Sequence, residues 1–296
     1  MLSINNNDEL LDGVYRDDNF RFADNTTYGL GGHAKAAYYP DSVQKLKAVF
    51  NYLLAQNETF VVLGNGSDIL AADGGFDGCI ICTKRLKGIY KTQNDTLYCL
   101  AGTTVGELLK YCTVNGLSGL EYLAGIPATM GGIAYMNGGA AGKYISDSVI
   151  KVDYFDGENR SFSNNQCKFG YKYSIMRDII GVIYGIELKV YPEKPENVKK
   201  NIACVLKGRN WHPKGKSCGC VFKNPQNISA GKLIDECGLK GLSVGGAVVS
   251  DKHANFILNN GGSAADVKKL IDKVKQTVFD KTGILLQEEV VYIGDF

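Results

Sequence analysis

The chain has 296 residues, with 33 Lys and Arg against 31 Asp and Glu, for a formal net charge of +2. This balance excludes the strongly basic surface expected of a nucleic-acid-binding protein. The sequence shows no apolar run long enough for a membrane span or a signal peptide, so we expect a cytoplasmic protein. A chain of this length predicts two or three lobes around a shared cleft.

The first third of the chain predicts a β-α start. Residues 33–40 (HAKAAYYP) are expected to form a strand. Ser42 is expected to cap a helix, one face of which carries Val43, Leu46, Val49, Phe50 and Leu53. Two further β-branched runs, residues 59–70 and 78–90, read as strands, and the first is interrupted by Gly64, Asn65, Gly66, Ser67 and Asp68.

The middle of the chain is rich in strands. We expect strands at residues 96–102 and 182–192, a helix at 104–116, and a hairpin over 151–162 that turns at Asp156-Gly157. Pro192 and Pro195 indicate a boundary between lobes.

Beyond these prolines we expect helices at 197–210 and 229–238, strands around 246–250 and 254–259, and a final helix. Ser263 and Asp266 resemble a capping box for the last helix, Gly283 ends it, and its apolar face carries Val267, Leu270, Ile271, Val274 and Val278.

The nine cysteines are scattered and odd in number, which argues against a disulfide framework. Cys79 and Cys82 form a C-x-x-C, but they fall in an apolar strand that would point their thiols to opposite sides. We therefore expect no metal site.

Two glycine-containing segments are candidates for ligand binding. GNGSD, residues 64–68, has the small residues and hydroxyl that suit a phosphate, although taken alone a plain tight turn is the favoured interpretation. It lacks the spacing of a dinucleotide fingerprint and the lysine of a P-loop. Residues 125–142 (GIPATMGGIAYMNGGAAG) are dense in glycine, which favours a flat aromatic group or a diphosphate lying against bare backbone.

A third candidate is KSCGCVFKNPQ, residues 216–226, which places Cys220 in a turn of small residues. A thiol is a stronger acid than a hydroxyl, so Cys220 is a candidate proton donor, with Lys223 or Asn224 orienting substrate oxygens. A buried structural cysteine is the plainer interpretation. Further on, Glu288 and Glu289 should point to opposite sides of a strand, so that one carboxylate is a candidate to face inward. Taken alone, a solvated pair of charges is the favoured interpretation. His253 is expected to make a structural hydrogen bond.

Taken together, in this order, these segments resemble the UDP-N-acetylenolpyruvoylglucosamine reductases of bacterial peptidoglycan synthesis, from about Asn25 to Gly294. The resemblance is carried by NTTYGLGGHA, GNGSDIL, GIPATMGGIAYMNGGAAG, CKFGYKYS, GCVFKNP, AGKLIDECGLKG, SDKHANFILN and L-x-x-E-V at Leu286 to Val290. The chain is similar to the shorter of the family's two structural types.

The resemblance implies an α+β protein with the vanillyl-alcohol-oxidase/PCMH-like FAD-binding fold, made of two subdomains and a C-terminal α/β substrate lobe. The expected boundaries are 1–84, 85–194 and 195–296. It also implies FAD as the cofactor and NADPH as the co-substrate. The activity expected from it is reduction of the enolpyruvyl ether of UDP-N-acetylglucosamine to UDP-N-acetylmuramate.

The resemblance also assigns residues. Those expected to hold FAD are Gly64, Asn65, Gly66, Ser67, Asp68, Gly125, Pro127, Thr129, Gly131, Gly132, Asn137 and Gly138. The expected substrate-binding residues are Arg209, Lys223 and Asn224, and the catalytic ones are Cys220, Glu289 and Lys172. Hydride goes from the flavin to the vinyl carbon, Cys220 protonates the resulting enediolate, and Glu289 shares a proton with it.

Three positions depart from the family pattern. Cys220 replaces the usual serine proton donor, and Lys172 replaces an arginine, which keeps the charge but loses the bidentate fork. His212 replaces a glutamine beside Trp211. Arg177, five residues after Lys172, is a candidate substitute for the lost guanidinium.

Two other functions remain open on the sequence alone. A flavin oxidase or dehydrogenase acting on a small alcohol would share the fold, but retention of GCVFKNP and L-x-x-E-V argues against it. A degenerate relative would bind FAD or a UDP-sugar without turnover, and the changes at Lys172 and His212 motivate that alternative.

Overall fold

The computed structural model describes residues 11–93, 95–210, 212–225 and 228–296. This part of the chain forms two compact units. The first contains residues 11–18, 36–65 and 78–209, and the second contains 19–35, 66–77 and 210–296. Each unit therefore gathers segments that are far apart in the sequence.

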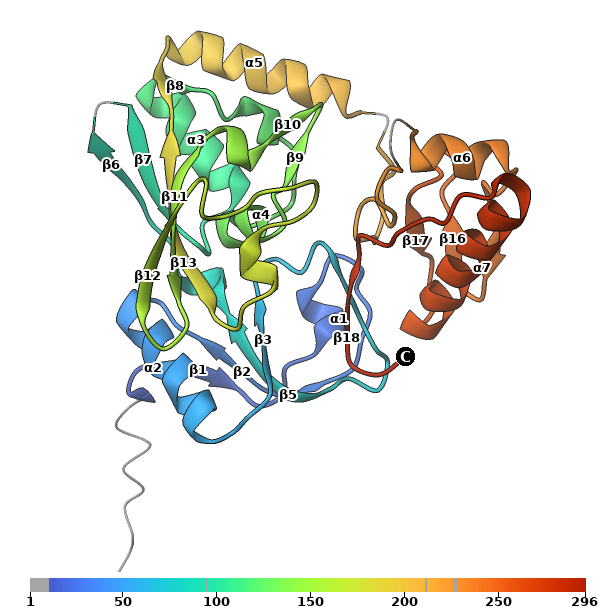
Figure 1. The fold of residues 1–296 in the computed structure, drawn as a ribbon, viewed down its shortest axis with the longest axis horizontal. Helices are drawn as coiled ribbons and strands as arrows, with labels where there is room; N and C mark the ends of the chain where they lie inside the picture. Colours follow the sequence, from blue (N-terminus) through green and yellow to red (C-terminus); the bar gives the residue numbers. More distant parts are fainter. Residues whose placement is uncertain (1–10, 94, 211, 226–227) are drawn as a thin grey trace, which may run out of the picture. The chain divides into compact units, whose positions relative to one another are not determined.

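The smaller sheet of the first unit has the strand order β1-β2-β5-β3 (Figure 1). Its strands are β1 (Tyr15–Asp17), β2 (Ala34–Tyr39), β5 (Phe76–Cys82) and β3 (Phe60–Leu63). Helix α2 (Val43–Ala55) joins β2 to β3, with the Ser42 side chain accepting from the Lys45 amide. Four of the five residues expected on its apolar face are buried, namely Leu46, Val49, Phe50 and Leu53. The predicted β-α start is confirmed.

The larger sheet of the first unit has the order β12-β11-β13-β7-β6, and all of its neighbouring strands are antiparallel. Its strands are β6 (Ile89–Gln93), β7 (Thr96–Leu100), β11 (Val149–Phe155), β12 (Asn159–Ser163) and β13 (Val182–Lys189). The β11-β12 hairpin turns through Gly157 at a φ of 104°, as the sequence predicts.

Three helices accompany this sheet. They are α3 (Val105–Asn115), α4 (Met130–Tyr135) and α5 (Pro195–Gly208). A capping box between Thr104 and Glu107 starts α3, and Gly116 ends it in the left-handed conformation. Two short strand pairs complete the unit, β8 (Leu117–Ser118) with β14 (Tyr191–Pro192) and β9 (Gly139–Ala140) with β10 (Lys143–Tyr144).

The second unit combines a three-stranded antiparallel sheet with helices. Its elements are α1 (Phe22–Asn25), β4 (Ile69–Ala71), α6 (Ala230–Glu236), β15 (Ser243–Val244), β16 (Ala247–Val249), β17 (Ile257–Asn259), α7 (Ala264–Thr282) and β18 (Val291–Ile293). β18 pairs in parallel with β4, which joins the end of the chain to the strand that follows GNGSD.

Helix α7 is the element that its sequence specifies best. Ser263 and Asp266 form the predicted capping box, and Gly283 ends the helix at a φ of 72°. Asp73 adds a contact that the sequence does not reveal, because its carboxylate accepts from the amides of Ala264 and Ala265 at 2.9 and 3.0 Å. A carboxylate at this end also complements the helix dipole.

Each unit has its own hydrophobic core. In the first unit the core lies between the sheets and helices α2, α3 and α4, and in the second it lies between α6, α7 and the three-stranded sheet. All the cysteines except Cys204 and Cys220 are buried, and Cys79 and Cys82 both belong to β5. Most of the cysteines therefore act as small apolar residues.

Two expectations about elements were wrong, and two short helices were not predicted. The strand expected over residues 78–90 ends at Cys82, where the Thr83 hydroxyl bonds to Leu63 and the Thr83 carbonyl accepts from Leu86, so that the chain turns. The strand expected before Glu288 is reduced to one isolated bridge, between Glu288 and Phe222. Helices α1 and α4 are too short to show a periodic pattern and were not expected.

The three-part division at residues 84 and 194 stays a prediction. Helix α5, which that division places in the third part, packs against α3 and belongs to the first compact unit.

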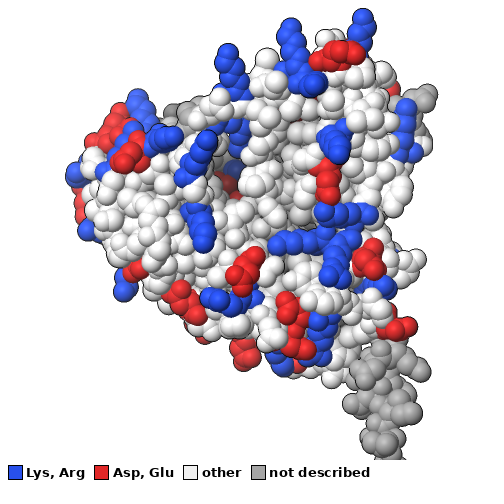
Figure 2. All heavy atoms as spheres, turned by 180° about the vertical axis from the view of Figure 1, so that it is seen from behind, with Lys and Arg blue, Asp and Glu red and all other residues white. Residues whose placement is uncertain are grey.

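Basic and acidic side chains are interspersed on the face drawn in Figure 2, as the near-neutral charge leads one to expect. Across the described ranges, none of the helices combines the length and apolar character that crossing a membrane requires.

Candidate active site

The turn that carries Cys220 is held between two other segments of the second unit. Cys220 forms a bridge with Phe256. The amide of Val221 donates to the Asn255 carbonyl at 2.9 Å, and the amide of Glu289 donates to the Val221 carbonyl at 2.7 Å. The fold thus brings Cys220 and Glu289, which are far apart in the sequence, onto adjacent backbone segments.

Asn255 braces this turn with its side chain. Its Oδ1 accepts from the amide of Phe222 at 2.9 Å, and its Nδ2 donates to the carbonyl of Phe222 at 2.8 Å. Asn255 is 2 % exposed, so both bonds are shielded from water. The sequence analysis missed Asn255, because a single asparagine carries no periodic signal.

The two glutamates lie in different surroundings. Glu289 is 7 % exposed. Glu288 instead pairs with Lys275 of α7. Burial alone would raise the pKa of Glu288, but the Lys275 hydrogen bond and charge outweigh it, so the pKa of this carboxyl lies below its usual value. Glu289 is therefore the inward carboxylate.

Cys218 lies next to these groups and has a different character from Cys220. Burial raises the pKa of the Cys218 thiol well above its usual value, and the nearby Asp68, Glu289 and Cys220 raise it further. Cys218 therefore stays a neutral thiol, whereas Cys220 is partly exposed. Asp68 of GNGSD is therefore close enough to Cys218 for its charge to act on that thiol.

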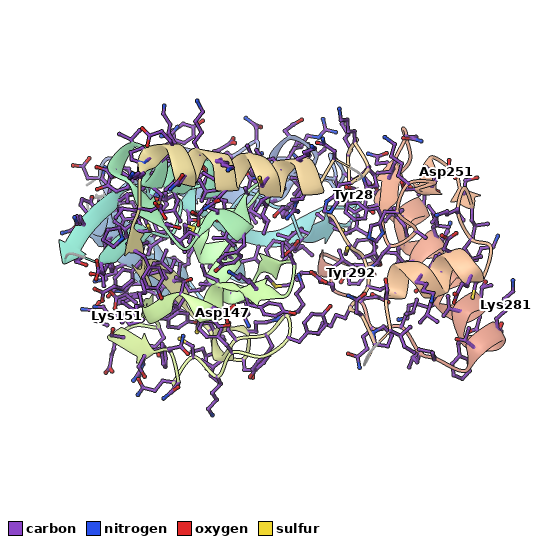
Figure 3. The ribbon with its side chains drawn as sticks, turned by 90° about the horizontal axis from the view of Figure 1, so that it is seen from above. Tyr28, Asp147, Lys151, Asp251, Lys281 and Tyr292 are labelled. Atoms are coloured by element: carbon purple, nitrogen blue, oxygen red, sulfur yellow. The ribbon has the colours of Figure 1, made fainter. Side chains whose placement is uncertain are left out.

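Thr27 and Tyr28 connect the first segment of the unit to this site. The amide of Thr27 donates to the Gly66 carbonyl at 3.1 Å, and its hydroxyl donates to the Ser217 carbonyl at 2.7 Å. The buried Tyr28, labelled in Figure 3, donates to the Ile257 carbonyl at 2.9 Å. Thr27 thus joins Gly66 of GNGSD to Ser217 in the turn that carries Cys220, a role that was not predicted from the sequence.

In the first unit, Lys172 occupies a tight turn in a strained conformation. Gly170 and Tyr173 exchange two backbone hydrogen bonds across the turn, at 3.0 and 3.2 Å. Lys172 has a φ of 55°, which is uncommon for a residue with a side chain. Arg177 donates from Nη1 to the carbonyl of Lys172 at 2.7 Å.

Asn137 holds this turn. It is buried, its Nδ2 donates to the Gly170 carbonyl at 2.8 Å, and its Oδ1 accepts from the Ser146 amide at 3.2 Å. Both polar ends of a residue expected to contact FAD are therefore bonded to protein, which supports a positioning role for it.

The two glycine segments meet in the first unit. Asn65 donates from Nδ2 to the Pro127 carbonyl at 2.7 Å. A Cβ placed on Gly64 would lie 2.3 Å from Oγ1 of Thr129, so no side chain fits between the segments. The hydroxyl of Thr129 is buried and has no hydrogen-bond partner among the described residues.

The remaining glycines differ in their surroundings. Gly131 lies against Ala101, to whose carbonyl its amide donates at 2.8 Å, and Gly138 lies against Ile133. Around Gly132 there is more room, since the nearest atom to an added Cβ would be the Thr129 hydroxyl oxygen, at 3.6 Å. A buried, unpartnered hydroxyl beside bare glycine backbone fits a cofactor that offers an oxygen or nitrogen to Thr129.

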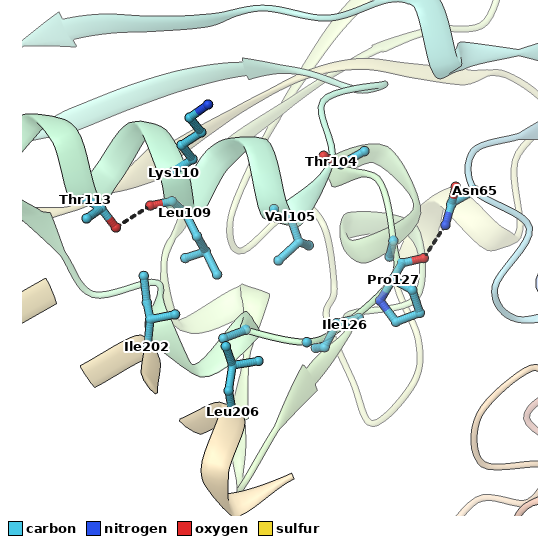
Figure 4. Close-up of a pocket in the computed structure, with 14 residues that line it drawn as sticks. Asn65, Thr104, Val105, Leu109, Lys110, Thr113, Ile126, Pro127, Ile202 and Leu206 are labelled. Atoms are coloured by element: carbon cyan, nitrogen blue, oxygen red, sulfur yellow. Dashed lines mark hydrogen bonds between the residues drawn. The ribbon is translucent and has the colours of Figure 1, made fainter. Parts of the chain in front are cut away.

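A pocket of about 550 Å³ adjoins these segments, lined by residues that include Asn65, Gly125 and Pro127 (Figure 4). Val105 and Leu109 of α3 point toward Ile202 and Leu206 of α5 across it. The Asn65 and Thr113 side chains bond within the protein, to Pro127 and Leu109. The walls therefore suit an apolar group.

The three expected substrate-binding residues are placed as follows. Arg209 follows α5 and lies against Gly125, where a Cβ would be 3.3 Å from its Nε. The amide of Lys223 donates to the Gln287 carbonyl at 2.8 Å, which fixes its backbone. Asn224 accepts at Oδ1 from the amide of Ala230, at the start of α6, at 2.9 Å.

His253 makes the structural hydrogen bond that the sequence predicts. Its Nδ1 accepts from the amide of Asn255 at 3.1 Å, and burial lowers its pKa below the usual value. Its ring packs against Phe256 at 5.0 Å between centroids, and His212 packs against the same phenylalanine at 5.6 Å. Trp211 lies outside the described residues.

Comparisons with known proteins agree on one family. Residues 212–293 match the model for the C-terminal domain of UDP-N-acetylenolpyruvoylglucosamine reductase, and residues 34–160 match an FAD binding domain. The chain is 38 % identical to the UDP-N-acetylenolpyruvoylglucosamine reductase of Carboxydothermus hydrogenoformans, over 94 % of each chain. The chain belongs to the UDP-N-acetylenolpyruvoylglucosamine reductase family.

Other members of the reductase family agree over the same length. The Prochlorococcus marinus reductase is 33 % identical, over 96 % of this chain and all of its own. The crystal structure of the Thermus caldophilus reductase matches with a TM-score of 0.81 at 34 % identity, covering 95 % of this chain and 99 % of that one. The predicted family and the α+β flavin-binding fold with a C-terminal lobe are confirmed.

Proposed function

We propose that this protein is an FAD-dependent, NADPH-using reductase that converts the enolpyruvyl ether of UDP-N-acetylglucosamine to UDP-N-acetylmuramate. Membership of the reductase family supports the reaction. The observation that carries the assignment is the adjacency of a partly exposed thiol, Cys220, and a buried carboxylate, Glu289, on segments joined by the bond from the Glu289 amide to Val221.

The residues present fit the cofactor. The unpartnered Thr129 hydroxyl would bond to it, and the bare backbone at Gly64 and Gly132 would let it approach closely. Ser67 and Asp68, with Gly66 held by Thr27, would complete the segment nearest the pyrophosphate. When bound, FAD supplies hydride transfer, taking hydride from NADPH and giving it to the vinyl carbon of the substrate.

Cys220 provides the proton in this proposal. Hydride addition leaves negative charge on the adjacent carbon, and the Sγ–H proton moves to that carbon while the C–H bond forms. A thiol, with an ordinary pKa of about 8.5, donates more readily than a serine hydroxyl. The clamped backbone at Val221 favours a fixed position for Sγ, because both of its peptide groups are bonded to neighbouring segments.

Glu289 and Lys172 stabilise the charge in this proposal. The backbone of Glu289 is held by its hydrogen bond to Val221, and its carboxyl would share a proton with the substrate carboxylate as the enediolate forms. The ammonium of Lys172 would supply a positive charge beside the negative enediolate. This electrostatic stabilisation is strongest where water is excluded. Arg209, Lys223 and Asn224 would bind the nucleotide diphosphate and sugar.

A cytoplasmic location belongs to the same proposal. Both substrates are charged small molecules that do not cross a membrane unaided, so the enzyme must meet them where they are made.

The test is an anaerobic two-step reaction. The flavin of the purified protein is first reduced with NADPH and then mixed with the enolpyruvyl UDP-sugar, while absorbance of oxidised flavin is followed. Rapid reoxidation is expected. A flavin that NADPH reduces but the UDP-sugar does not reoxidise would overturn the assignment, and oxygen consumption with small alcohols in the absence of NADPH would favour an oxidase instead.

A binding experiment distinguishes the reductase from a relative that binds its ligands without turnover. A protein that takes up FAD and is stabilised thermally by the UDP-sugar, yet never reoxidises, would be a relative that binds without turnover.

A further inference from the structure

The turn that carries Lys172 is attached at three places to the chain around the end of helix α4. Asn137 donates to the Gly170 carbonyl, the Ser174 hydroxyl donates to the Tyr135 carbonyl at 2.7 Å, and the guanidinium of Arg177 lies 5.7 Å from the centre of the Tyr135 ring. The turn and the glycine-dense segment therefore form one connected body.

Lys172 itself adopts a conformation that needs such support. A φ of 55° brings Cβ close to the backbone and is unfavourable for lysine. Strained residues persist only where the surroundings enforce them, and they concentrate at functional sites. One contact made directly to Lys172 is the 2.7 Å hydrogen bond from Arg177 Nη1 to its carbonyl. This bond is charge-assisted, which makes it stronger than a neutral one.

We propose that Arg177 is a positioning residue for Lys172: its guanidinium anchors the Lys172 carbonyl, fixes the left-handed turn, and so delivers the ammonium of Lys172 to a constant place. The inference rests on the proposed function of Lys172. It explains how a flexible lysine can serve at a position where the family resemblance implies arginine. Lysine has a mobile four-carbon stem and no planar fork, so its side chain does not fix the position of the charge by itself. A rigid backbone at Lys172 reduces the range of positions that the ammonium can take.

A competing role is that Arg177 is itself the catalytic cation and Lys172 a bystander. The two roles differ in a double-mutant cycle. If Arg177 acts only through Lys172, removing Arg177 from a protein that already lacks the ammonium costs nothing further in rate. If Arg177 acts on substrate directly, the two losses multiply.

The experiment compares four proteins: wild type, Arg177→Met, Lys172→Ala and the double variant. Methionine keeps the aliphatic stem against Tyr135 while removing the donor. The rate of flavin reoxidation by the enolpyruvyl UDP-sugar is measured after reduction by NADPH. We expect Arg177→Met to slow this step about tenfold or more, as slight misplacement of a catalytic group does. Lys172→Ala should slow it further, and the double variant should match Lys172→Ala.

A structural readout keeps the inference separate from the proposed function. Amide hydrogen exchange of the flavin-free protein is followed over residues 170–178. Arg177→Met should speed exchange of the Tyr173 amide, which bonds to Gly170 in the wild type. Arg160→Met, which removes an exposed arginine paired with Asp156 in the same unit, serves as the matched control and should change neither exchange nor rate.

The possible outcomes distinguish failure of the proposed function from failure of the inference about Arg177. Wild-type protein that never reoxidises would defeat the proposed function, while faster exchange in Arg177→Met would still support the anchoring of the turn. Unchanged exchange and unchanged rate in Arg177→Met would overturn the inference, as would multiplied losses in the double variant. If Arg177→Met fails to fold, Arg177→Lys is used, and exchange of the Tyr173 amide and the reoxidation rate should then change together. A lowered rate with wild-type exchange, or faster exchange with a wild-type rate, would overturn the inference.

Discussion

Asn255 and Phe222 form a closed pair, in which one buried carboxamide satisfies both the amide and the carbonyl of one backbone residue at 2.9 and 2.8 Å. An asparagine side chain here does what a neighbouring strand would do. The pair fixes the backbone two residues after Cys220. It should therefore contribute both to the stability of the fold and to the position of the thiol proposed as the proton donor.

We expect Asn255→Ala to lower the free energy of unfolding by about 1–3 kcal/mol, because it leaves buried groups of Phe222 unpaired. Urea denaturation measures this change. Asn115→Ala is the control, since Asn115 makes a single exposed bond to Tyr111 and should cost less. The rate of flavin reoxidation should also fall in Asn255→Ala, and an unchanged rate would show that the brace is purely structural.

Cys220→Ala should leave reduction of the flavin by NADPH nearly intact and slow reoxidation by the UDP-sugar by on the order of 100-fold or more, because the proton donor is lost. Cys220→Ser should keep much of the rate, since a hydroxyl can also donate. Rapid-mixing absorbance separates the two steps. Equal slowing of both steps in Cys220→Ala would contradict the role, and Cys204→Ala, at an exposed cysteine of α5, is the control.

Thr129→Val should act in opposite directions on the two forms of the protein. The flavin-free protein should gain about 1 kcal/mol or less of stability, because a buried hydroxyl without a partner is removed. The FAD dissociation constant should rise about tenfold, the equivalent of one hydrogen bond. Fluorescence titration of the flavin-free protein measures it, with Thr113→Val as the control. An unchanged dissociation constant would remove Thr129 from the cofactor site.

The pair of Lys275 and Glu288 should make stability depend on pH. The pKa of Glu288 is lower in the folded protein than in the unfolded chain, so its contribution is present above the unfolded value, near 4.3, and is lost as pH falls through the folded value. Lys275→Met should therefore cost roughly 1 kcal/mol at pH 7 and progressively less below pH 4. Thermal unfolding from pH 3 to 7 tests it, and a pH-independent difference between variant and wild type would show that packing, not charge, is responsible.

Helices and strands that are specified by neighbouring residues could be predicted from the sequence alone. Helices α2 and α7 follow from capping residues and an apolar face of helical period, and both are present with the expected buried residues. Local alternation also separated Glu288 from Glu289, since neighbouring side chains point to opposite sides of an extended backbone. The ordered motifs were sufficient to predict the family, because several short segments in one order are more specific than any one of them alone.

The pairing of distant segments within a unit became known only from the folded chain. The same holds for the side chains that hydrogen-bond to the backbone of the candidate site. Thr27, Asn255 and Asn137 each hydrogen-bond to a residue 33 or more positions away, namely Ser217, Phe222 and Gly170. An isolated polar residue has no periodicity, so its partner is set by packing of the whole chain. For the same reason, the sequence named Lys172 and Arg177 as separate cations, and the fold joined them through a backbone carbonyl.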